Sequence, residues 1–364
     1  MSSNMNKGTN ASFRPEGHAT LIGSIPLADH DEALELIFKY TPSIPLWPQL
    51  PGNREEGMLL QFNEGLPLFD KTGDKTYFNT SSSRFETEQL AFFEEYIAVS
   101  ESMQLLADSR FQISRSHAKG LYRLVEKAKT SPDILALKGQ ITGPFTLLTG
   151  IADENNRPGY YNPEVREMIT KGLAMKAAWQ VNFLKAAEKP VIVFIDEPAL
   201  AGLGSNTFIS VSNEDIAMDQ TEMIDAIHNC GGLAGIHVCA NTDWPLLLGL
   251  DYDILNFDAY GFFDKLAACK KEVDDFLDRG GIIAWGLVPT SSREDILSES
   301  SVSLVARWEE QAAQLAGPNR DITALLRQSL ITPSCGTGSL TAELATRVLE
   351  LTQSVSDTLR AKYL

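Results

Sequence analysis

The segment LAGIHVC, residues 233–239, is an apolar run that ends in a histidine and a cysteine two positions apart. Short, continuously apolar runs are typical of strands that are buried on both faces of a parallel sheet. Residues two apart on a strand project to the same side, so the imidazole of His237 and the thiol of Cys239 would point together. From this segment alone, the pair is either part of a metal site or two buried core residues.

Seven further runs of this kind occur along the chain, most of them separated by amphipathic helical patterns. They are ATLIG (19–23), IPLW (44–47), ILALKG (134–139), VIVFID (191–196), ILNFD (254–258), GIIAWG (281–286) and LITPSC (330–335). Eight parallel strands, each followed by a helix, predict an α/β fold of the (β/α)8 TIM-barrel type. A doubly wound open sheet is the alternative, but IGSIPLAD after the first run is not a glycine-rich phosphate loop.

The pattern predicts one domain over residues 18–364, preceded by a flexible arm over residues 1–17 that is rich in Ser, Asn and Gly. Roughly 85 residues separate the second and third predicted strands. The segment at about 60–130 is therefore expected to be an inserted helical and loop region that covers a site or binds a partner.

Composition excludes several classes of protein. The 364 residues carry a net charge of −17, whereas nucleic-acid binding needs clustered Lys and Arg, so we expect no nucleic-acid partner. No run approaches the roughly 18 apolar residues of a membrane span, and the polar N-terminus is not a signal peptide, so we expect a cytoplasmic protein. The four cysteines are irregularly spaced and do not form a disulfide framework.

In a barrel of this type the active site lies at the carboxyl ends of the strands. Polar residues follow or end the predicted strands there: Ser24, Gln49, Gln140, Thr142, Asp196, His237, Cys239, Asp258 and Cys335. Zinc prefers thiolate, imidazole and carboxylate ligands in a tetrahedral arrangement. His237, Cys239 and Cys335, with Asp258 from the neighbouring sixth strand, therefore predict a zinc site. Cys230 and Cys269 fall within helical patterns and are expected to be structural.

Six motifs carry a family resemblance: IGSIP (22–26), KGQITGP (138–144), FIDEPAL (194–200), IHVC (236–239), NFDAY (256–260) and TPSCG (332–336). In this order they resemble the catalytic domain of cobalamin-independent methionine synthase and its zinc-dependent methyltransferase relatives. The resemblance extends from about residue 18 to the C-terminus. That superfamily also includes uroporphyrinogen decarboxylase, which lacks the thiol ligands.

The resemblance implies a zinc ion held by His237, Cys239 and Cys335, with the family's acidic ligand at Asp258. Methionine synthases usually have Glu there, and the interval after Cys239 is three residues shorter in this chain. The resemblance also implies that Asp196 receives the amino group of homocysteine and that Ser24 contacts its carboxylate. We expect Gln140 and Thr142 to contribute to substrate binding, and Asp196 to act in catalysis together with the three ligands.

This ligand set suits sulfur chemistry. A free alkyl thiol has a pKa of about 8.5, and coordination to zinc deprotonates it. Thiolate ligands moderate the Lewis acidity of the metal and leave a bound substrate sulfur electron-rich. We therefore expect a methyltransferase that activates a small, homocysteine-like thiol for attack on a methyl group, giving methionine or another methyl thioether.

Departures from methionine synthase bear on the two substrates. Those enzymes carry a second barrel that helps to hold the folate donor, and this chain has room for one. We therefore expect methylcobalamin or a methylated corrinoid protein as the donor, with residues 60–130 as a docking surface. The family's Glu for the homocysteine amine is replaced by Gly52, for which Glu55 or Glu56 could substitute. The acceptor stays open between homocysteine, coenzyme M and another small thiol.

Two other functions stay open at this stage. PLWPQLPGN (45–53) is similar to the porphyrinogen-binding segment of uroporphyrinogen decarboxylase, but Gln49 and Asn53 replace the arginines that should pair with propionate groups. The other is a noncatalytic barrel that binds a corrinoid or a thiol without turnover.

Overall fold

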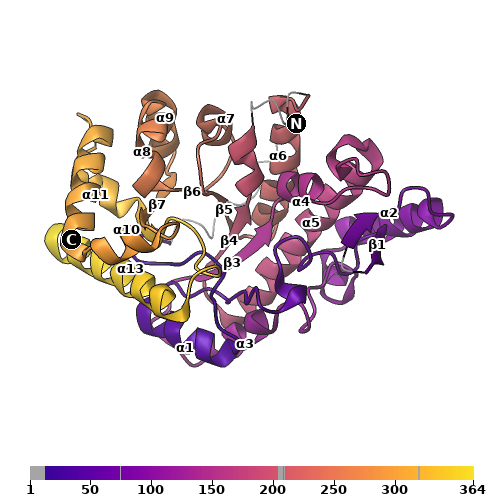
Figure 1. Ribbon diagram of the computed structural model, residues 1–364, viewed down its shortest axis with the longest axis horizontal. Coiled ribbons are helices and arrows are strands. Elements are labelled where there is room, and N and C mark those ends of the chain that lie inside the picture. Colours follow the sequence, from indigo (N-terminus) through magenta and orange to yellow (C-terminus); the bar gives the residue numbers. More distant parts are fainter. Residues whose placement is uncertain (1–12, 74, 204–207, 209, 319) are drawn as a thin grey trace.

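The computed structural model describes residues 13–73, 75–203, 208, 210–318 and 320–364. At its centre is a curled parallel sheet of six strands in the order β3-β4-β5-β6-β7-β8 (Figure 1). The strands are β3 (Leu137–Thr142), β4 (Val191–Asp196), β5 (Leu233–Val238), β6 (Ile254–Phe257), β7 (Ile282–Val288) and β8 (Ser329–Pro333). The predicted α/β fold with a parallel sheet is confirmed.

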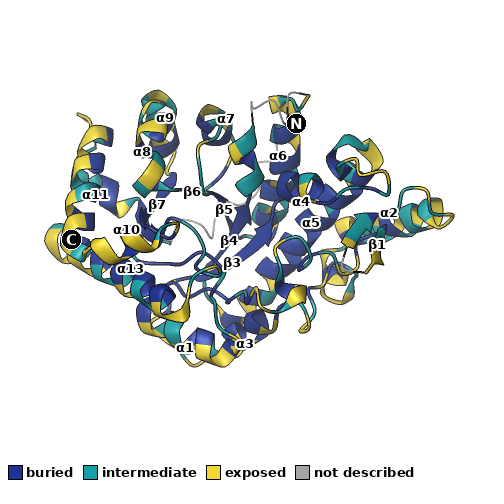
Figure 2. Cartoon of the chain, in the orientation of Figure 1, coloured by how far each residue is buried: buried dark blue, intermediate teal, exposed yellow. Residues whose placement is uncertain are grey.

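All residues of these six strands are buried, because helices cover the outer face and the sheet curls around its own inner face (Figure 2). The inner face is lined at its amino-terminal end by an apolar cluster that includes Ile192, Phe194, Ile254 and Leu330. Burial on both sides explains why the strands are apolar throughout and do not alternate with polar residues. It also makes any polar residue on the inner face conspicuous.

The helices between the strands are α4 (Pro144–Gly150), α5 (Pro163–Leu184), α6 (Asn213–Asn229), α7 (Trp244–Gly249), α8 (Ala259–Ala267), α9 (Lys270–Asp278), α10 (Arg293–Ser298), α11 (Ser301–Leu315) and α12 (Ile322–Arg327). Two more helices, α1 (His30–Tyr40) and α13 (Ala342–Tyr363), pack against each other near the ends of the described chain. None of the helices in the described residues is both long enough and apolar enough to cross a lipid bilayer.

The first two predicted strands, 19–23 and 44–47, do not form strands of the sheet. They make isolated parallel bridges instead, Ala19 with Ile331 of β8 and Leu46 with Lys138 of β3. A third bridge, Ser24 with Gln49, joins the chain just after the first segment to the chain just after the second. The second segment contains prolines at 45 and 48, which have no N–H group to donate, so a continuous ladder cannot form there.

The predicted strands at 233–239, 254–258, 281–286 and 330–335 match β5 to β8 within two residues at each end, and two further predictions differ by more. The third strand, predicted at 134–139, spans 137–142, where it pairs with β4 from Leu137–Val191 to Thr142–Asp196. Of the arm predicted at 1–17, residues 1–12 lie outside the described residues. Residues 13–17 are not loose: the backbone N–H of Gly17 donates to the carbonyl of Ser329 (2.8 Å), and Phe13 packs against the inner apolar cluster.

The segment predicted as an insertion contains a two-stranded antiparallel hairpin, β1 (Phe69–Thr72) and β2 (Lys75–Phe78), followed by α2 (Phe85–Glu101) and α3 (Lys119–Ala128). α3 packs against α1, whereas the hairpin and α2 lie at the periphery of the molecule (Figure 1). Four large apolar side chains on or just after α2 are exposed: Leu90, Ile97, Met103 and Leu105. The helical patterns predicted here correspond to α2 and α3.

Lys176 of α5 is fully buried on the outer side of the sheet, where its Nζ donates to the carbonyl of Gln112 (3.1 Å). Burial lowers the pKa of this lysine to about 7, and the negative charge of Glu64 opposes the shift only in part. The folded protein therefore binds this proton less strongly than the unfolded chain does.

Stability should consequently increase with pH as a result of Lys176. Between pH 7 and about 10.5 the unfolded chain holds a proton that the folded protein has released, so the free energy of unfolding gains up to about 1.4 kcal/mol per pH unit from this residue. We expect the difference in unfolding free energy between wild type and Lys176→Met to rise from pH 7.5 to 9.5 in urea denaturation. A difference that stays constant with pH would contradict this expectation.

Candidate metal centre

A pocket of about 340 Å³ opens at the carboxyl ends of the strands. Its wall includes Ser24, Glu56, Asp196, His237, Cys239 and Cys335, together with apolar groups such as Ile22, Met58 and Pro198. Among the described residues, no lysine or arginine lines it. The charged groups on its wall are therefore carboxylates.

His237 near the end of β5, Cys239 just after it and Cys335 just after β8 come together on this wall. One potential ligand atom from each of the three lies within 4.8 Å of the other two. The strand geometry explains the first pair, because residues 237 and 239 project to the same side. The structure thus brings together three of the four predicted metal ligands.

The ring of His237 is held in one orientation by Asn256 of β6. Nδ1 of the imidazole is hydrogen-bonded to Oδ1 of Asn256, while Nδ2 of Asn256 donates to the carbonyl of Ala284 and to Oγ1 of Thr332, both at 2.8 Å. Because the amide oxygen can only accept, Nδ1 carries the proton and the lone pair of Nε2 is free for a metal. Sequence analysis missed Asn256, although its position two before Asp258 places it on the inner face of the sixth strand.

Burial and the contact between the two thiols shift the pKa values of the three potential ligands. Burial lowers the pKa of His237 to about 4, so the imidazole is neutral at neutral pH and able to act as a ligand. A hydrogen bond between the two sulfur atoms lowers the pKa of Cys239 and raises that of Cys335. Two adjacent thiols and a neutral imidazole with a free nitrogen form a donor set that fits zinc with one open coordination position.

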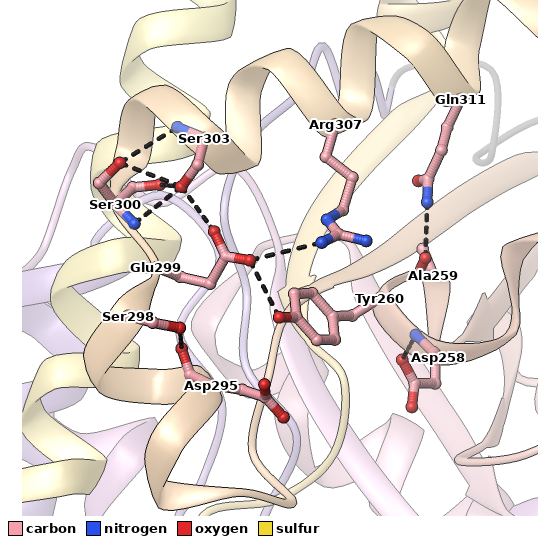
Figure 3. Close-up of polar contacts among 11 residues, drawn as sticks. Asp258, Ala259, Tyr260, Asp295, Ser298, Glu299, Ser300, Ser303, Arg307 and Gln311 are labelled. Atoms are coloured by element: carbon pink, nitrogen blue, oxygen red, sulfur yellow. Dashed lines mark hydrogen bonds and ion pairs between the residues drawn. The ribbon is translucent and has the colours of Figure 1, made fainter.

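Asp258, predicted as the fourth ligand, is not brought into this cluster. Its carboxylate caps the amino end of α8, where Oδ1 accepts from the backbone N–H of Gly261 at 2.8 Å (Figure 3). The start of α8 is itself fixed, because the hydroxyl of Tyr260 donates to Glu299 and Gln311 donates to the carbonyl of Ala259. An acidic residue between a strand and a helix serves here as a helix cap.

Asp196 ends β4 and faces the pocket, as predicted. The residue is only 5% exposed, and its Oδ1 has no hydrogen-bond partner among the described residues. Burial raises the pKa of Asp196 to about 7, an effect that the positive charge of Lys138 opposes. Oδ1 is thus the buried oxygen of a residue that lines the pocket, and a carboxylate in that position is able to bind a cationic group of a ligand.

Glu197 points away from the pocket and accepts hydrogen bonds from residues of α4 and α6, outside the sheet. Its carboxylate accepts from the backbone N–H groups of Phe145 and Thr146 (3.0 and 2.8 Å) and from Nε2 of Gln220 (2.7 Å). It thereby satisfies the free amide groups at the start of α4. The adjacent carboxylates of Asp196 and Glu197 therefore serve different purposes, one facing the pocket and one capping a helix.

The other predicted substrate-binding residues divide into two groups. Ser24 lines the pocket, and its Oγ accepts from the backbone N–H of Gly338 (3.2 Å). Gln140 and Thr142 do not line it, because their side chains donate to the carbonyls of Trp47 (2.9 Å) and Met58 (2.7 Å). These two residues hold the pocket wall in place rather than facing the cavity.

Glu56 is the second carboxylate on the pocket wall, and Glu55 is exposed elsewhere. The side chain of Glu56 is anchored, since Oε1 lies 2.6 Å from Nε2 of His30 and Oε2 accepts from the backbone N–H of Leu50 (2.8 Å). The two remaining cysteines, Cys230 and Cys269, lie at the ends of α6 and α9, outside the cluster.

No family model matches the sequence, and no curated protein matches it significantly. A protein from Listeria monocytogenes, assigned as a vitamin B12-independent methionine synthase, is similar in structure, with a TM-score of 0.54 and 14% identity over 94% of this chain and 97% of that chain. A B12-independent methionine synthase from Shewanella sp. W3-18-1, solved with selenomethionine, gives a TM-score of 0.47 and 17% identity over 66% of this chain and 67% of that chain. The likeness to the Listeria protein shows a common fold.

Replacing Asn256 should weaken metal binding without removing a ligand. In Asn256→Leu the imidazole loses the acceptor that fixes its tautomer, and we expect the affinity for Zn²⁺ to fall about 10- to 100-fold. Competition with a chromophoric chelator measures this change. In Asn256→Asp the acceptor is retained, so more of the affinity should survive. Equal Zn²⁺ affinities in wild type and Asn256→Leu would show that the contact does not orient the ligand.

Asp258→Asn tests whether Asp258 is a ligand. Asn caps helices about as well as Asp does, so the start of α8 should be preserved. Since the carboxylate lies outside the cluster, we expect the Zn²⁺ affinity of this variant to stay within about threefold of wild type in the same chelator assay. A much larger loss would restore Asp258 as the fourth ligand.

Proposed function

We propose that this protein is a zinc-dependent methyltransferase that transfers a methyl group to a small thiol. The observation that carries the proposal is the convergence of His237, Cys239 and Cys335 within 4.8 Å on the wall of a pocket. The proposal treats the six-stranded sheet and the two bridging segments as one (β/α)8 barrel. This chain shares its fold with the Listeria protein that is assigned as a methionine synthase, and that likeness supports the proposal.

His237, Cys239 and Cys335 would hold the zinc ion, and the coordination position that they leave open would face the pocket. When bound, zinc would supply the positive charge that lowers the pKa of an incoming thiol and favours its thiolate form. Thiolate ligands keep that sulfur nucleophilic, which suits attack on a methyl carbon.

The remaining wall of the pocket orients the thiol. Asp196 lines the cavity with a carboxylate that can receive an ammonium group, and the anchored carboxylate of Glu56 adds a second negative charge. Ser24 lines the same cavity, beside the backbone of Gly338. These groups favour an aminothiol such as homocysteine, with methionine as the product. A sulfonate such as coenzyme M would meet carboxylates and no cationic side chain of the described wall.

For the methyl donor, the proposal favours methylcobalamin or a methylated corrinoid protein. Met58 on the pocket wall is 46% exposed, so this part of the wall reaches the surface of the protein. The exposed apolar side chains Leu90, Ile97 and Leu105 on and near α2 offer a further contact surface for such a protein. The lack of cationic residues on the described wall disfavours a porphyrinogen, whose propionates need basic partners.

Metal content and methyl transfer test the proposal together. The purified protein should contain one zinc per chain and should convert homocysteine and methylcobalamin to methionine, detected by mass spectrometry. Cys239→Ala and Cys335→Ala should each lower the rate at least about a hundredfold, because each removes a ligand. Cys269→Ser is the matched control, since Cys269 lies outside the cluster, and should retain the wild-type rate.

Two results would overturn the proposal. One is wild-type protein that binds no zinc, and the other is ligand variants that retain the wild-type rate. Zinc and thiol binding without methyl transfer from any donor would instead support the noncatalytic function.

A further inference from the structure

The inner face of the sheet carries a fully buried lysine that the proposed function has not used. Lys138 of β3 is 0% exposed, and its Nζ has no hydrogen-bond partner among the described residues. The ammonium lies 4.1 Å from the centroid of the Phe194 ring, the only cation–π contact described for it. An unpaired buried ammonium costs free energy unless a nearby negative charge compensates it.

The compensating charge is Asp196 of β4. Lys138 is paired with Ile192, and Asp196 lies four residues after Ile192 on the same strand. Burial lowers the pKa of Lys138 to about 8, and the Asp196 carboxylate opposes that shift. Burial raises the pKa of Asp196, and the positive charge of Lys138 opposes that shift in turn. No direct hydrogen bond or ion pair joins the two groups, and Oδ1 of Asp196 is also partnerless. The two charges therefore interact without a direct contact, while Asp196 still lines the pocket.

The packing below the pocket keeps the ammonium in this place. The ring of Phe194 lies against Gly235, where an added Cβ would come within 2.4 Å of the ring. The glycine thus leaves room for the ring, and the ring provides the surface on which the ammonium rests. Nothing in this arrangement brings Lys138 to the wall of the pocket.

We propose that Lys138 is a positioning residue that acts through Asp196: as a fixed buried counter-charge, it allows Asp196 to face the pocket as a carboxylate and bind the ammonium group of the thiol substrate. This inference rests on the proposed function. A lysine that only filled space would affect folding without affecting the recognition of an amine.

Thiol binding to the Co²⁺-loaded protein tests the inference, because thiolate coordination gives an absorption band. Homocysteine and 4-mercaptobutanoate, which has the same chain without the amine, are the two probes. In Lys138→Met we expect homocysteine to bind roughly 10- to 100-fold more weakly, and 4-mercaptobutanoate to bind within twofold of wild type. Lys176→Met removes a second fully buried lysine, outside the sheet, and should change neither affinity. An unchanged ratio of the two affinities in Lys138→Met would overturn the inference.

Unfolding of the metal-free protein provides a test that does not depend on thiol binding. Lys138→Met leaves a lone buried carboxylate, whereas Lys138→Met combined with Asp196→Asn leaves no charge. We expect the denaturation midpoint of the double variant to be higher than the sum of the two single effects predicts. Additive effects would overturn the pairing of Lys138 with Asp196. Failure of wild type to bind either probe would count against the proposed function, while this cycle would still decide the pairing.

Discussion

The register of three neighbouring parallel strands determines the candidate centre. Asp196 of β4 is paired with His237 of β5, and His237 is paired with Asn256 of β6. Since paired residues project to the same side of a sheet, this alignment places a carboxylate, an imidazole and an amide side by side. A shift of one residue between any two of these strands would turn one of the three side chains into the apolar outer layer.

The polar groups beneath the pocket are compatible with a buried interior because almost all of them are satisfied. Asn256 uses its oxygen and its amide hydrogens, and Thr332 accepts one of the latter. Exceptions among the described residues include Lys138, Asp196 and Gln140, whose Nζ, Oδ1 and Oε1 atoms have no partner. Two of these three residues, Lys138 and Asp196, carry opposite charges, so their buried atoms compensate each other without a direct contact.

The sequence predicted the sheet well where its strands are continuously apolar, as at 191–196 and 233–238, because burial on both faces leaves that pattern. It failed at 19–23 and 44–47, where apolar residues are present but the backbone makes isolated bridges. Spacing was sufficient to associate His237 with Cys239. It could not decide Asp258, because an acid between a strand and a helix is equally suited to be a ligand or a cap. The placement of Lys138 below Asp196 and the contact of Asn256 with His237 depend on the register between neighbouring strands, which a single sequence does not specify.

The contact between Asn256 and His237 also limits how protons can move in the pocket. With Nδ1 committed to the amide, a metal bound at Nε2 would leave the imidazole no free nitrogen for proton transfer. General acid or base catalysis by this histidine is therefore closed to the loaded protein. If the proposed function holds, a proton released by an entering thiol would pass to water or to a carboxylate of the wall and not to this histidine.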